Sequence, residues 1–456
     1  MSVRTASGIV ESHRKGEVTP AETVRRCFEH IRAVGDPGIF ITLRDQNEVL
    51  AEAHSLKDNG DLYGVPVAVK DNIDVAGLPT TAACPAFAYE AEEDAEAVTR
   101  LKRAGAIIIG KTNLDQFATG LVGLRTPYPA TRNALRRDLI PGGSSSGSAV
   151  AVAAGIVPLA LGTDTAGSGR VPAMLNNIVG LKPSLGLVST RGVVPACRTL
   201  DCVSVFTLTV DDAWTALSVI AAYDSNDPYS RNRERGSLGE APTGLTVGVP
   251  LASQRLFFDD RRAAADYEAA LARLSRLGLA LTEIDMAPLY ETARLLYGGP
   301  WLAERYFAIR NVLDDNPGAL HPVTREIIAA GAKLNAIDAF AAFYRLAELR
   351  RAADNIFKDV DALALPTAPT VYTRAQVEAD PIALNSRLGT YTNFVNLLDL
   401  CGTAVPAALQ EDGTPFGISF LAPGGQDALA ASLAKAFHAD CALPLGAPAH
   451  LAAVAK

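Results

Sequence analysis

Two loops rich in glycine and serine, separated by a short apolar stretch, constrain this chain more than any other feature. The first loop reads Gly-Gly-Ser-Ser-Ser-Gly-Ser over residues 142–148, and the second reads Gly-Thr-Asp-Thr-Ala-Gly-Ser-Gly-Arg over 162–170. Residues 149–161 between them are apolar and predict a buried helix. Small residues let backbone N–H groups approach a ligand closely, and hydroxyls placed there can act as nucleophiles. We therefore expect the chemistry of this protein at these two loops.

The composition narrows the class of protein. Apolar residues make up 48% and charged residues 20%, as in folded proteins, and the formal net charge is −8. Because the chain has no long basic run, nucleic acid and anionic membranes are not expected partners. The six cysteines are scattered without a C-x-x-C pair, which predicts reduced thiols, a cytoplasmic location and no structural zinc. Residues 149–161 are too short to span a bilayer, and the N-terminus has no signal-peptide pattern.

Helices and strands alternate along most of the chain. This order predicts an α/β fold with a mixed or largely parallel sheet. Apolar runs predict strands at residues 65–69, 106–110, 178–181, 203–210, 245–250, 281–286, 361–366 and 415–421. Amphipathic or capped stretches predict helices at residues 20–33, 46–56, 95–104, 211–222, 261–277 and 428–439, with a mostly helical region at 287–357.

The glycine- and serine-rich loops allow several interpretations. A flexible linker would not pass straight into an apolar segment and then recur, and a P-loop needs a lysine that is missing here. Residues 143–147 match the G-x-S-x-G nucleophile elbow in form, but residues 136–141 before them make a poor strand. The downstream histidines lie in stretches typical of helix surfaces or chain ends, which disfavours a Ser–His–Asp triad; they are His321, His438 and His450.

A serine nucleophile without histidine needs another base, and lysine is the usual substitute. The lysine must be neutral, and lowering its pKa from about 10.4 to about 7 requires roughly 4–5 kcal/mol, which burial can supply. Lys70 ends the apolar run 65–69, so its side chain would be drawn into the interior. Lys111 ends a similar run, and local pattern alone does not choose between the two lysines.

Three segments in this order carry a family resemblance: Val-Lys-Asp-Asn at 69–72 and the two loops at 142–148 and 162–168. Together they resemble the amidase signature family over essentially the whole chain. The resemblance implies that Ser168 is the acyl-forming nucleophile, Ser144 the bridging serine after a cis peptide bond, and Lys70 the general base. It also implies an oxyanion hole formed by the backbone N–H groups of Thr165, Ala166, Gly167 and Ser168.

The same resemblance implies the amidase signature fold, an α/β fold with a central mixed β-sheet flanked by α-helices on both faces. We expect a single amidase domain over residues 1–456, with the signature core at about 60–210 and the substrate pocket in the helical region at about 287–357. No metal or organic cofactor is implied. By family analogy we expect a homodimer, although no surface pattern in the sequence identifies its interface.

Within this family the chain is most similar to the allophanate hydrolases, through residues 112–120, 297–305 and 391–396. That similarity implies hydrolysis of allophanate, a small urea-like amide with a carboxylate, in urea or cyanuric acid nitrogen catabolism. We expect ammonia release with N-carboxyurea as the first product, followed by CO2 and further ammonia. Arg305 can bind the carboxylate bidentately and Tyr297 can donate a hydrogen bond. The expected substrate-binding residues are Tyr297, Arg305, Gly120 and Asn393.

The chain departs from the family pattern at two points. Ser146 stands where many members have glycine, and the chain ends at Lys456 without the additional C-terminal domain that many allophanate hydrolases carry. The alternatives are a biuret- or malonamide-type amidase, the glutaminase subunit of a tRNA-dependent amidotransferase, and a non-catalytic scaffold. The presence of Lys70, Ser144 and Ser168 together disfavours the scaffold.

Overall fold

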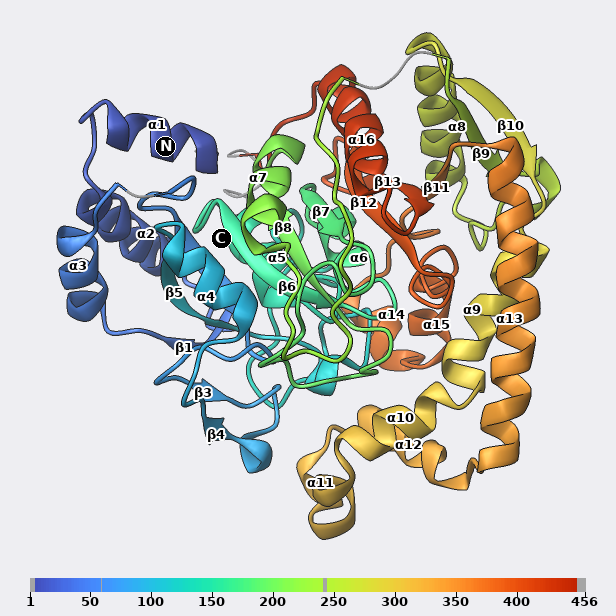
Figure 1. Cartoon of the computed structure of the whole chain (residues 1–456), viewed down its shortest axis with the longest axis horizontal. Helices are drawn as coiled ribbons and strands as arrows, with labels where there is room; N and C mark the ends of the chain where they lie inside the picture. Colours follow the sequence, from blue (N-terminus) through green and yellow to red (C-terminus); the bar gives the residue numbers. More distant parts are fainter. Residues whose placement is uncertain (1–4, 59, 241–243, 449–456) are drawn as a thin grey trace.

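A mixed eleven-stranded sheet runs through the middle of the computed structural model, which describes residues 5–58, 60–240 and 244–448 (Figure 1). Its strands are β1 (Phe40–Leu43), β2 (Pro66–Lys70), β5 (Ile107–Thr112), β6 (Leu159–Asp164), β7 (Val179–Lys182), β8 (Cys202–Thr207), β9 (Thr246–Pro250), β10 (Ala280–Ile284), β11 (Ala362–Pro366), β12 (Leu400–Leu409) and β13 (Pro415–Pro423). Their order across the sheet is β1-β5-β2-β6-β8-β7-β12-β13-β11-β9-β10. Strand β2 is parallel to β5 and β6, and β9 is parallel to β10 and β11, whereas the other pairs are antiparallel. The predicted mixed sheet is confirmed.

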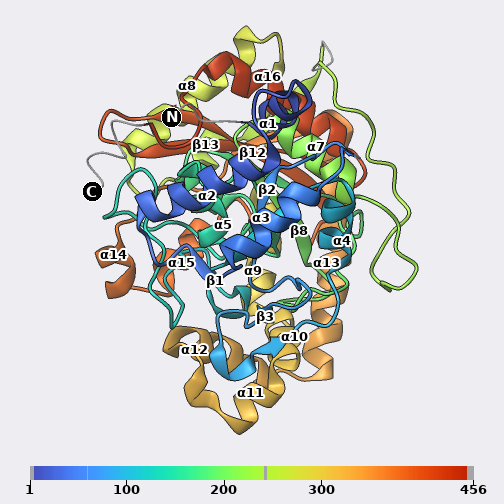
Figure 2. The ribbon, with the colours of Figure 1, turned by 90° about the vertical axis from the view of Figure 1, so that its left-hand side faces the viewer.

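Helices cover both faces of this sheet. Alternate side chains of its central strands point to opposite sides, and both sets are apolar, so each face needs helices to bury it. On β5, Ile108 packs in one apolar cluster, whereas Ile107 and Ile109 pack in another. The Ile108 cluster includes α1 (Ala6–Arg14), α4 (Glu96–Arg103), α7 (Val210–Ile220) and α16 (Asp427–Cys441). The opposite cluster includes α2 (Pro20–Val34), α3 (Gln46–Ser55) and α5 (Ser146–Ala153), seen in front of the sheet in Figure 2. Burying each such isoleucine contributes about 1.5–3 kcal/mol.

Local sequence signals explain where helix α2 begins and ends. Thr19 accepts a hydrogen bond from the backbone of Glu22, and the Glu22 carboxylate accepts one from the Thr19 backbone. This capping box satisfies two N–H groups at the helix start. At the other end Gly35 adopts the left-handed conformation, with φ 60°, which terminates the helix. The predicted start at this threonine-proline pair is confirmed.

The expected single helix over residues 149–161 is wrong. Only residues up to Ala153 belong to α5, and the segment then turns at Gly155, which has φ +71°. It continues as strand β6. Gly155 and Pro158 interrupt the apolar run, and its second half is buried as a strand between β2 and β8. Strands β1 and β12 were not among the predicted elements.

The predicted helical region is confirmed and lies along one side of the molecule (Figure 1). It comprises α9 (Ala287–Gly298), α10 (Trp301–Ala308), α11 (Arg310–Asp315), α12 (Pro322–Ala329) and α13 (Ala336–Asp359). The remaining helices and the small hairpin are α6 (Val171–Leu175), α8 (Arg261–Arg276), α14 (Arg374–Ala379), α15 (Ala383–Leu388), β3 (Pro79–Thr80) and β4 (Tyr89–Glu90). In the described part of the chain no single helix has the length and apolarity to cross a bilayer; one pair bent by 98°, Pro322–Lys333 with Ala336–Asp359, meets those criteria jointly.

Candidate active site

The end of strand β2 places Lys70 against the first serine-rich loop. The Lys70 Nζ donates hydrogen bonds to Ser144 Oγ at 2.8 Å and to Thr163 Oγ1 at 2.7 Å. The peptide bond between Gly143 and Ser144 is cis. All three side chains are buried, and Thr163 comes from β6, the strand beside β2. The parallel arrangement of β2 and β6 therefore brings Lys70 beside Thr163, and the loop before α5 adds Ser144 to the same amine.

The two lysines that the local sequence pattern does not distinguish, Lys70 and Lys111, have different environments. Burial lowers the pKa of Lys70 to about 7, even though nearby aspartates, Asp115 foremost, raise it. The amine is thus partly neutral near pH 7 and can accept a proton. Lys111 instead lies 3.3 Å from the carboxylate of Asp71 in a buried ion pair and contacts none of the serines. Of these two lysines, Lys70 is the one whose amine contacts a serine of the first loop.

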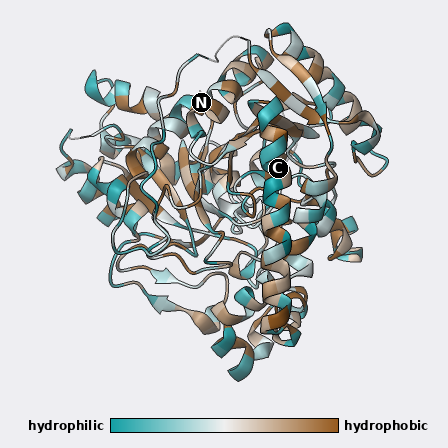
Figure 3. Cartoon of the chain, turned by 45° about the vertical axis from the view of Figure 1, so that its right-hand side comes forward, coloured by the Kyte–Doolittle hydropathy of each residue, from teal (hydrophilic) through white to brown (hydrophobic). Residues whose placement is uncertain are grey.

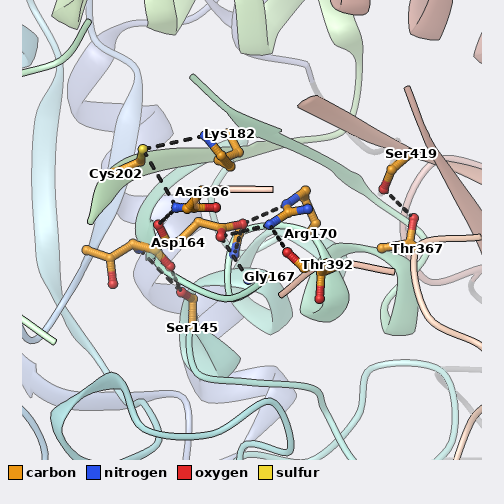
Figure 4. A network of polar contacts seen from close by, with 12 residues as sticks. Ser145, Asp164, Gly167, Arg170, Lys182, Cys202, Thr367, Thr392, Asn396 and Ser419 are labelled. Atoms are coloured by element: carbon orange, nitrogen blue, oxygen red, sulfur yellow. Dashed lines mark hydrogen bonds and ion pairs between the residues drawn. The ribbon is translucent and has the colours of Figure 1, made fainter. Parts of the chain in front are cut away.

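The second loop is shaped by a buried ion pair between Asp164 and Arg170 (Figure 4). The Arg170 Nε and Nη2 donate to the two carboxylate oxygens at 2.9 and 3.0 Å. The same carboxylate accepts the N–H groups of Gly167 at 2.8 Å and Gly169 at 3.0 Å. Burial raises the pKa of Asp164, but Arg170 outweighs it, so the net pKa lies below its usual value. This charged core folds the loop around Ser168.

Ser168 lies at the tip of this loop and is 2% exposed. Among the described residues its hydroxyl has no hydrogen-bond partner, so the contact between Ser144 and Ser168 is not formed in this structure. An added Cβ on Gly167, which has φ +123°, would lie 2.4 Å from Thr392 Oγ1. The loop can follow this path only with glycine at that position.

The backbone N–H groups around Ser168 differ in whether they have a hydrogen-bond acceptor. No acceptor is present in the described chain for the N–H groups of Thr165, Ala166 and Ser168, whereas that of Gly167 is bonded to Asp164. The expected four-donor oxyanion hole thus has three available donors here. The Thr165 hydroxyl donates to Asp201, whose pKa is raised to about 6 because the carboxyl is buried. Asp201 also accepts two backbone N–H groups from residues 196 and 197.

Arg305 is a buried guanidinium on α10 with 1% exposure. Its Nη1 donates to Thr119 Oγ1 at 3.0 Å, its Nη2 makes a long contact of 3.5 Å to the Tyr297 hydroxyl, and its guanidinium lies 5.2 Å from the centre of the Tyr297 ring. In the described chain it forms no ion pair with a carboxylate, and its Nε has no hydrogen-bond partner. Its charge nevertheless lowers the pKa of Lys70, which places it near the serine site.

The loop at residues 115–125 connects Arg305 with the first serine loop. Asp115 receives the N–H groups of three residues within this loop and donates its own N–H to the Ser144 carbonyl at 3.0 Å. A Cβ on Gly120 would lie 2.5 Å from the Asp115 carboxylate, so this glycine lets the loop close. Asn393 is 8% exposed, and its Oδ1 has no partner among the described residues. Gly120 therefore allows the loop to close against Asp115, whereas the Oδ1 of Asn393 is available to accept a hydrogen bond.

Several contributing residues were not assigned by the sequence analysis. They are Thr163, Asp164, Arg170 and Asp201 around the serines, and Asp115 and Thr119 in the loop at residues 115–125. Asp164 and Arg170 both belong to the second loop. Their opposite charges, six residues apart beside a glycine turn, are the sequence signal that could have predicted the ion pair. Asp201 and Thr119 carry no such signal because only the fold brings them to the site. The described residues hold no group of three or more histidines, cysteines or carboxylates suited to a metal ion.

Residues 22–430 match the profile of the amidase family. The chain belongs to that family. Among curated amidase relatives, the urea amidolyase of Saccharomyces cerevisiae is 48% identical over 390 residues, which cover 84% of this chain and 21% of that protein. This chain thus spans about a fifth of the length of that relative. A glutamyl-tRNA(Gln) amidotransferase subunit from Halothermothrix orenii is 32% identical and is matched over 91% of its length, with 90% of this chain covered.

Solved structures agree with the family assignment. The allophanate hydrolase of Kluyveromyces lactis superposes with a TM-score of 0.90 at 41% identity, covering 98% of this chain and 73% of that one. The corresponding glutamyl-tRNA(Gln) amidotransferase subunit from Thermotoga maritima superposes with a TM-score of 0.80 at 29% identity, covering 94% of both chains. The predicted amidase signature fold is confirmed.

Proposed function

We propose that this chain hydrolyses the terminal amide of allophanate and releases ammonia. The observation that carries the proposal is Arg305, a guanidinium with 1% exposure that has no carboxylate partner among the described residues. Burial lowers the pKa of Arg305, but nearby groups that include Asp201 and Glu304 raise it above its usual value, so the guanidinium stays charged and can pair with an anionic ligand. Allophanate offers an amide for Ser168 and a carboxylate for Arg305. The similarity of the chain to an allophanate hydrolase and a urea amidolyase supports the same substrate.

The proposed chemistry is a proton relay. Neutral Lys70 accepts the proton of Ser144, which accepts that of Ser168, and the Ser168 oxygen attacks the amide carbonyl. The N–H groups of Thr165, Ala166 and Ser168 stabilise the oxyanion, each worth about 3–4 kcal/mol in the transition state. The proton then returns along the relay to the leaving nitrogen, and ammonia departs. Water hydrolyses the acyl-enzyme by the reverse proton path.

The balance of atoms corrects the expected first product. N-carboxyurea is another description of allophanate itself, so it cannot be what hydrolysis yields. Replacing the terminal NH2 of allophanate by oxygen from water leaves N-carboxycarbamate and one ammonia. Loss of CO2 from that dianion gives carbamate, which decomposes to a second CO2 and a second ammonia. The contribution proposed for this chain ends at the first ammonia.

Substrates that differ only in charge provide the test. Biuret has the skeleton of allophanate with a neutral amide in place of the carboxylate. We expect the wild type to prefer allophanate, and Arg305→Gln to lower kcat/KM for allophanate by about 10- to 100-fold while biuret changes little. Ammonia release is the readout, and Ser168→Ala, with no turnover of either substrate, controls for contaminating amidases. Equal losses on both substrates would remove the carboxylate assignment.

A second candidate is glutamine hydrolysis, favoured by the similarity to glutamyl-tRNA(Gln) amidotransferase subunits over nine-tenths of the chain. Glutamine carries its own carboxylate, but further from the amide carbon than in allophanate by two bonds, so a short pocket would reject it. Glutamine and malonamate therefore belong in the same assay. Preference for glutamine would favour the amidotransferase assignment, and preference for malonamate over malonamide supports the short carboxylate pocket.

We infer that the chain forms a homodimer through one face of α13. Figure 3 shows apolar residues near the N-terminal end of this helix, where Ile337, Phe340, Phe343 and Tyr344 are 80, 59, 52 and 69% exposed. These side chains present roughly 500 Å² of surface, a large part of the about 800 Å² that each partner buries in a stable dimer.

Light scattering on the wild type and Phe340→Glu tests this assembly, with Tyr223→Glu, at another exposed aromatic, as the control. We expect twice 47.9 kDa for the wild type and the control, and a monomer for Phe340→Glu. A monomeric wild type rejects the dimer, and a dimeric Phe340→Glu variant places the interface elsewhere.

A further inference from the structure

A second buried arginine, Arg125, contacts the same threonine as Arg305. Its side chain is 2% exposed. The Nη1 donates to the carbonyl of Thr119 at 2.9 Å and the Nη2 donates to the carbonyl of Pro381 at 2.8 Å. Within the described chain it has no carboxylate partner at ion-pair distance, and its Nε has no hydrogen-bond partner. A lysine or glutamine would donate from a single nitrogen, whereas the guanidinium of Arg125 donates to the two carbonyls from two nitrogens in fixed directions.

Thr119 connects the two arginines directly. Its carbonyl accepts from Arg125, and its hydroxyl accepts from Arg305 Nη1 at 3.0 Å. Burial lowers the pKa of Arg125, Asp115 raises it, and the charge of Arg305 lowers it, so the two guanidiniums lie within electrostatic range of each other. Any shift of Arg125 therefore moves the residue that orients Arg305.

Arg125 also fixes the loop 115–125 as a whole. Its N–H donates to Asp115 at 2.9 Å, and its carbonyl accepts from the N–H of Gln116 at 2.7 Å. The bond to Pro381 attaches the loop to the segment that leads into α15, where Asn385 accepts the N–H of Leu121 at 2.8 Å. These contacts hold the loop between Arg305 and the Ser144 carbonyl.

We propose that Arg125 is a positioning residue for anion specificity: it fixes Thr119 so that Arg305 meets the substrate carboxylate, and its own charge favours an anionic substrate. The inference rests on the proposed function, in which Arg305 binds that carboxylate. Arg125 contacts none of Lys70, Ser144 and Ser168 in the described structure, so its loss acts on substrate binding rather than on the proton relay.

The test compares allophanate with its neutral counterpart biuret in wild type, Arg125→Gln and Arg125→Lys. We expect Arg125→Gln to raise KM for allophanate about tenfold with kcat changed less than about threefold, and to leave biuret hydrolysis within about threefold. Arg125→Lys keeps the charge but not the fork, so it recovers part of the preference. It also serves as the folded variant if the glutamine substitution does not fold.

Two further variants separate positioning from general damage. Arg350→Gln removes an arginine on α13 whose Nε holds the Leu397 carbonyl at 2.9 Å, and we expect an unchanged allophanate-to-biuret ratio. Asn385→Ala weakens the attachment of the loop without removing a charge. An equal change in the allophanate-to-biuret ratio for this variant would show that Arg125 only attaches the loop and has no role in anion specificity. The double variant Arg125→Gln/Arg305→Gln should lose less preference than the two single losses combined, because the positioning effect of Arg125 acts through Arg305 and only its charge effect adds to the loss.

The outcomes also distinguish this inference from the proposed function. A wild type that does not prefer allophanate over biuret overturns both. A wild type with that preference, combined with an Arg125→Gln variant that keeps it, overturns only the role of Arg125. Parallel losses on both substrates for the Gln and Lys variants do the same, because they indicate a structural role alone.

Discussion

Replacing Lys70 by methionine is expected to abolish activity and to change the pH dependence of stability. The pKa of Lys70 is lowered from 10.5 to about 7 by burial. That shift corresponds to about 5 kcal/mol between the protonated and neutral forms. The folded chain holds this proton only below about pH 7, whereas the unfolded chain holds it up to about pH 10.5. Between these values the unfolded state binds more protons, so the stability of the wild type rises with pH.

The size of the effect follows from this window. At pH 6 both states carry the proton, and the folded state bears the full cost of a buried ammonium. At pH 9 the folded state has released the Lys70 proton and the unfolded state has not, which raises the free energy of unfolding by about 2–3 kcal/mol relative to pH 6. Methionine does not titrate, and all other groups are common to the two proteins. The difference in unfolding free energy should therefore shift by about 2–3 kcal/mol in favour of the wild type from pH 6 to pH 9.

Urea unfolding followed by tryptophan fluorescence measures this difference, since Trp214 and Trp301 are both buried. Ammonia release over the same pH range should give a wild-type kcat/KM that falls below about pH 7 as Lys70 becomes protonated. Lys111→Met is the matched control. It leaves Asp71 unpaired and should cost about 3–5 kcal/mol of stability, but the acid limb of the activity should remain.

A difference in stability that does not change with pH would refute the reasoning. Lys70 would then keep an ordinary pKa in the folded chain and would be charged at neutral pH. A charged lysine cannot accept the proton of Ser144, so the base assignment would fall with it. The same conclusion follows if the wild-type acid limb is absent.

Three other substitutions test the surroundings of the serines. Ser144→Ala should lower kcat by at least about 10³-fold, whereas Ser145→Ala, at the adjacent serine, should retain activity. Gly167→Ala should inactivate the enzyme because its Cβ would lie 2.4 Å from a neighbouring side-chain oxygen, while Gly155→Ala, with φ +71° and open space, should cost only about 1 kcal/mol by urea unfolding. Burial raises the pKa of Asp201 from 3.8 to about 6. The stabilising contribution of its protonated form is therefore fully present below pH 3.8 and is lost as the pH rises through 6. Relative to Asp201→Asn, the free energy of unfolding of the wild type should increase by up to about 3 kcal/mol from pH 8 to pH 4.

The sequence by itself determined the elements whose signals are local. Capping, helical periodicity and apolar strands predicted α2, α8, β2, β5 and β9 near their observed positions, because these signals act over a few residues. The run at 149–161 was misassigned because a buried helix and a buried strand are equally apolar. Lys70, Ser144 and Ser168 were selected through the resemblance of three segments, in their order along the chain, to the amidase signature family.

The family resemblance selected Lys70 over Lys111, but only the tertiary structure shows the physical difference between them. Both end an apolar strand, but β6 lies beside β2 and supplies Thr163 to Lys70, whereas Lys111 on β5 meets Asp71. The same holds for Arg305, which looks like an ordinary residue of an amphipathic helix in the sequence. Burial, the absence of a described carboxylate partner and the pairing with Thr119 arise from segments almost 200 residues apart. Charge and desolvation depend on three-dimensional neighbours, so the linear sequence carries the residues of the site but not their protonation or their partners.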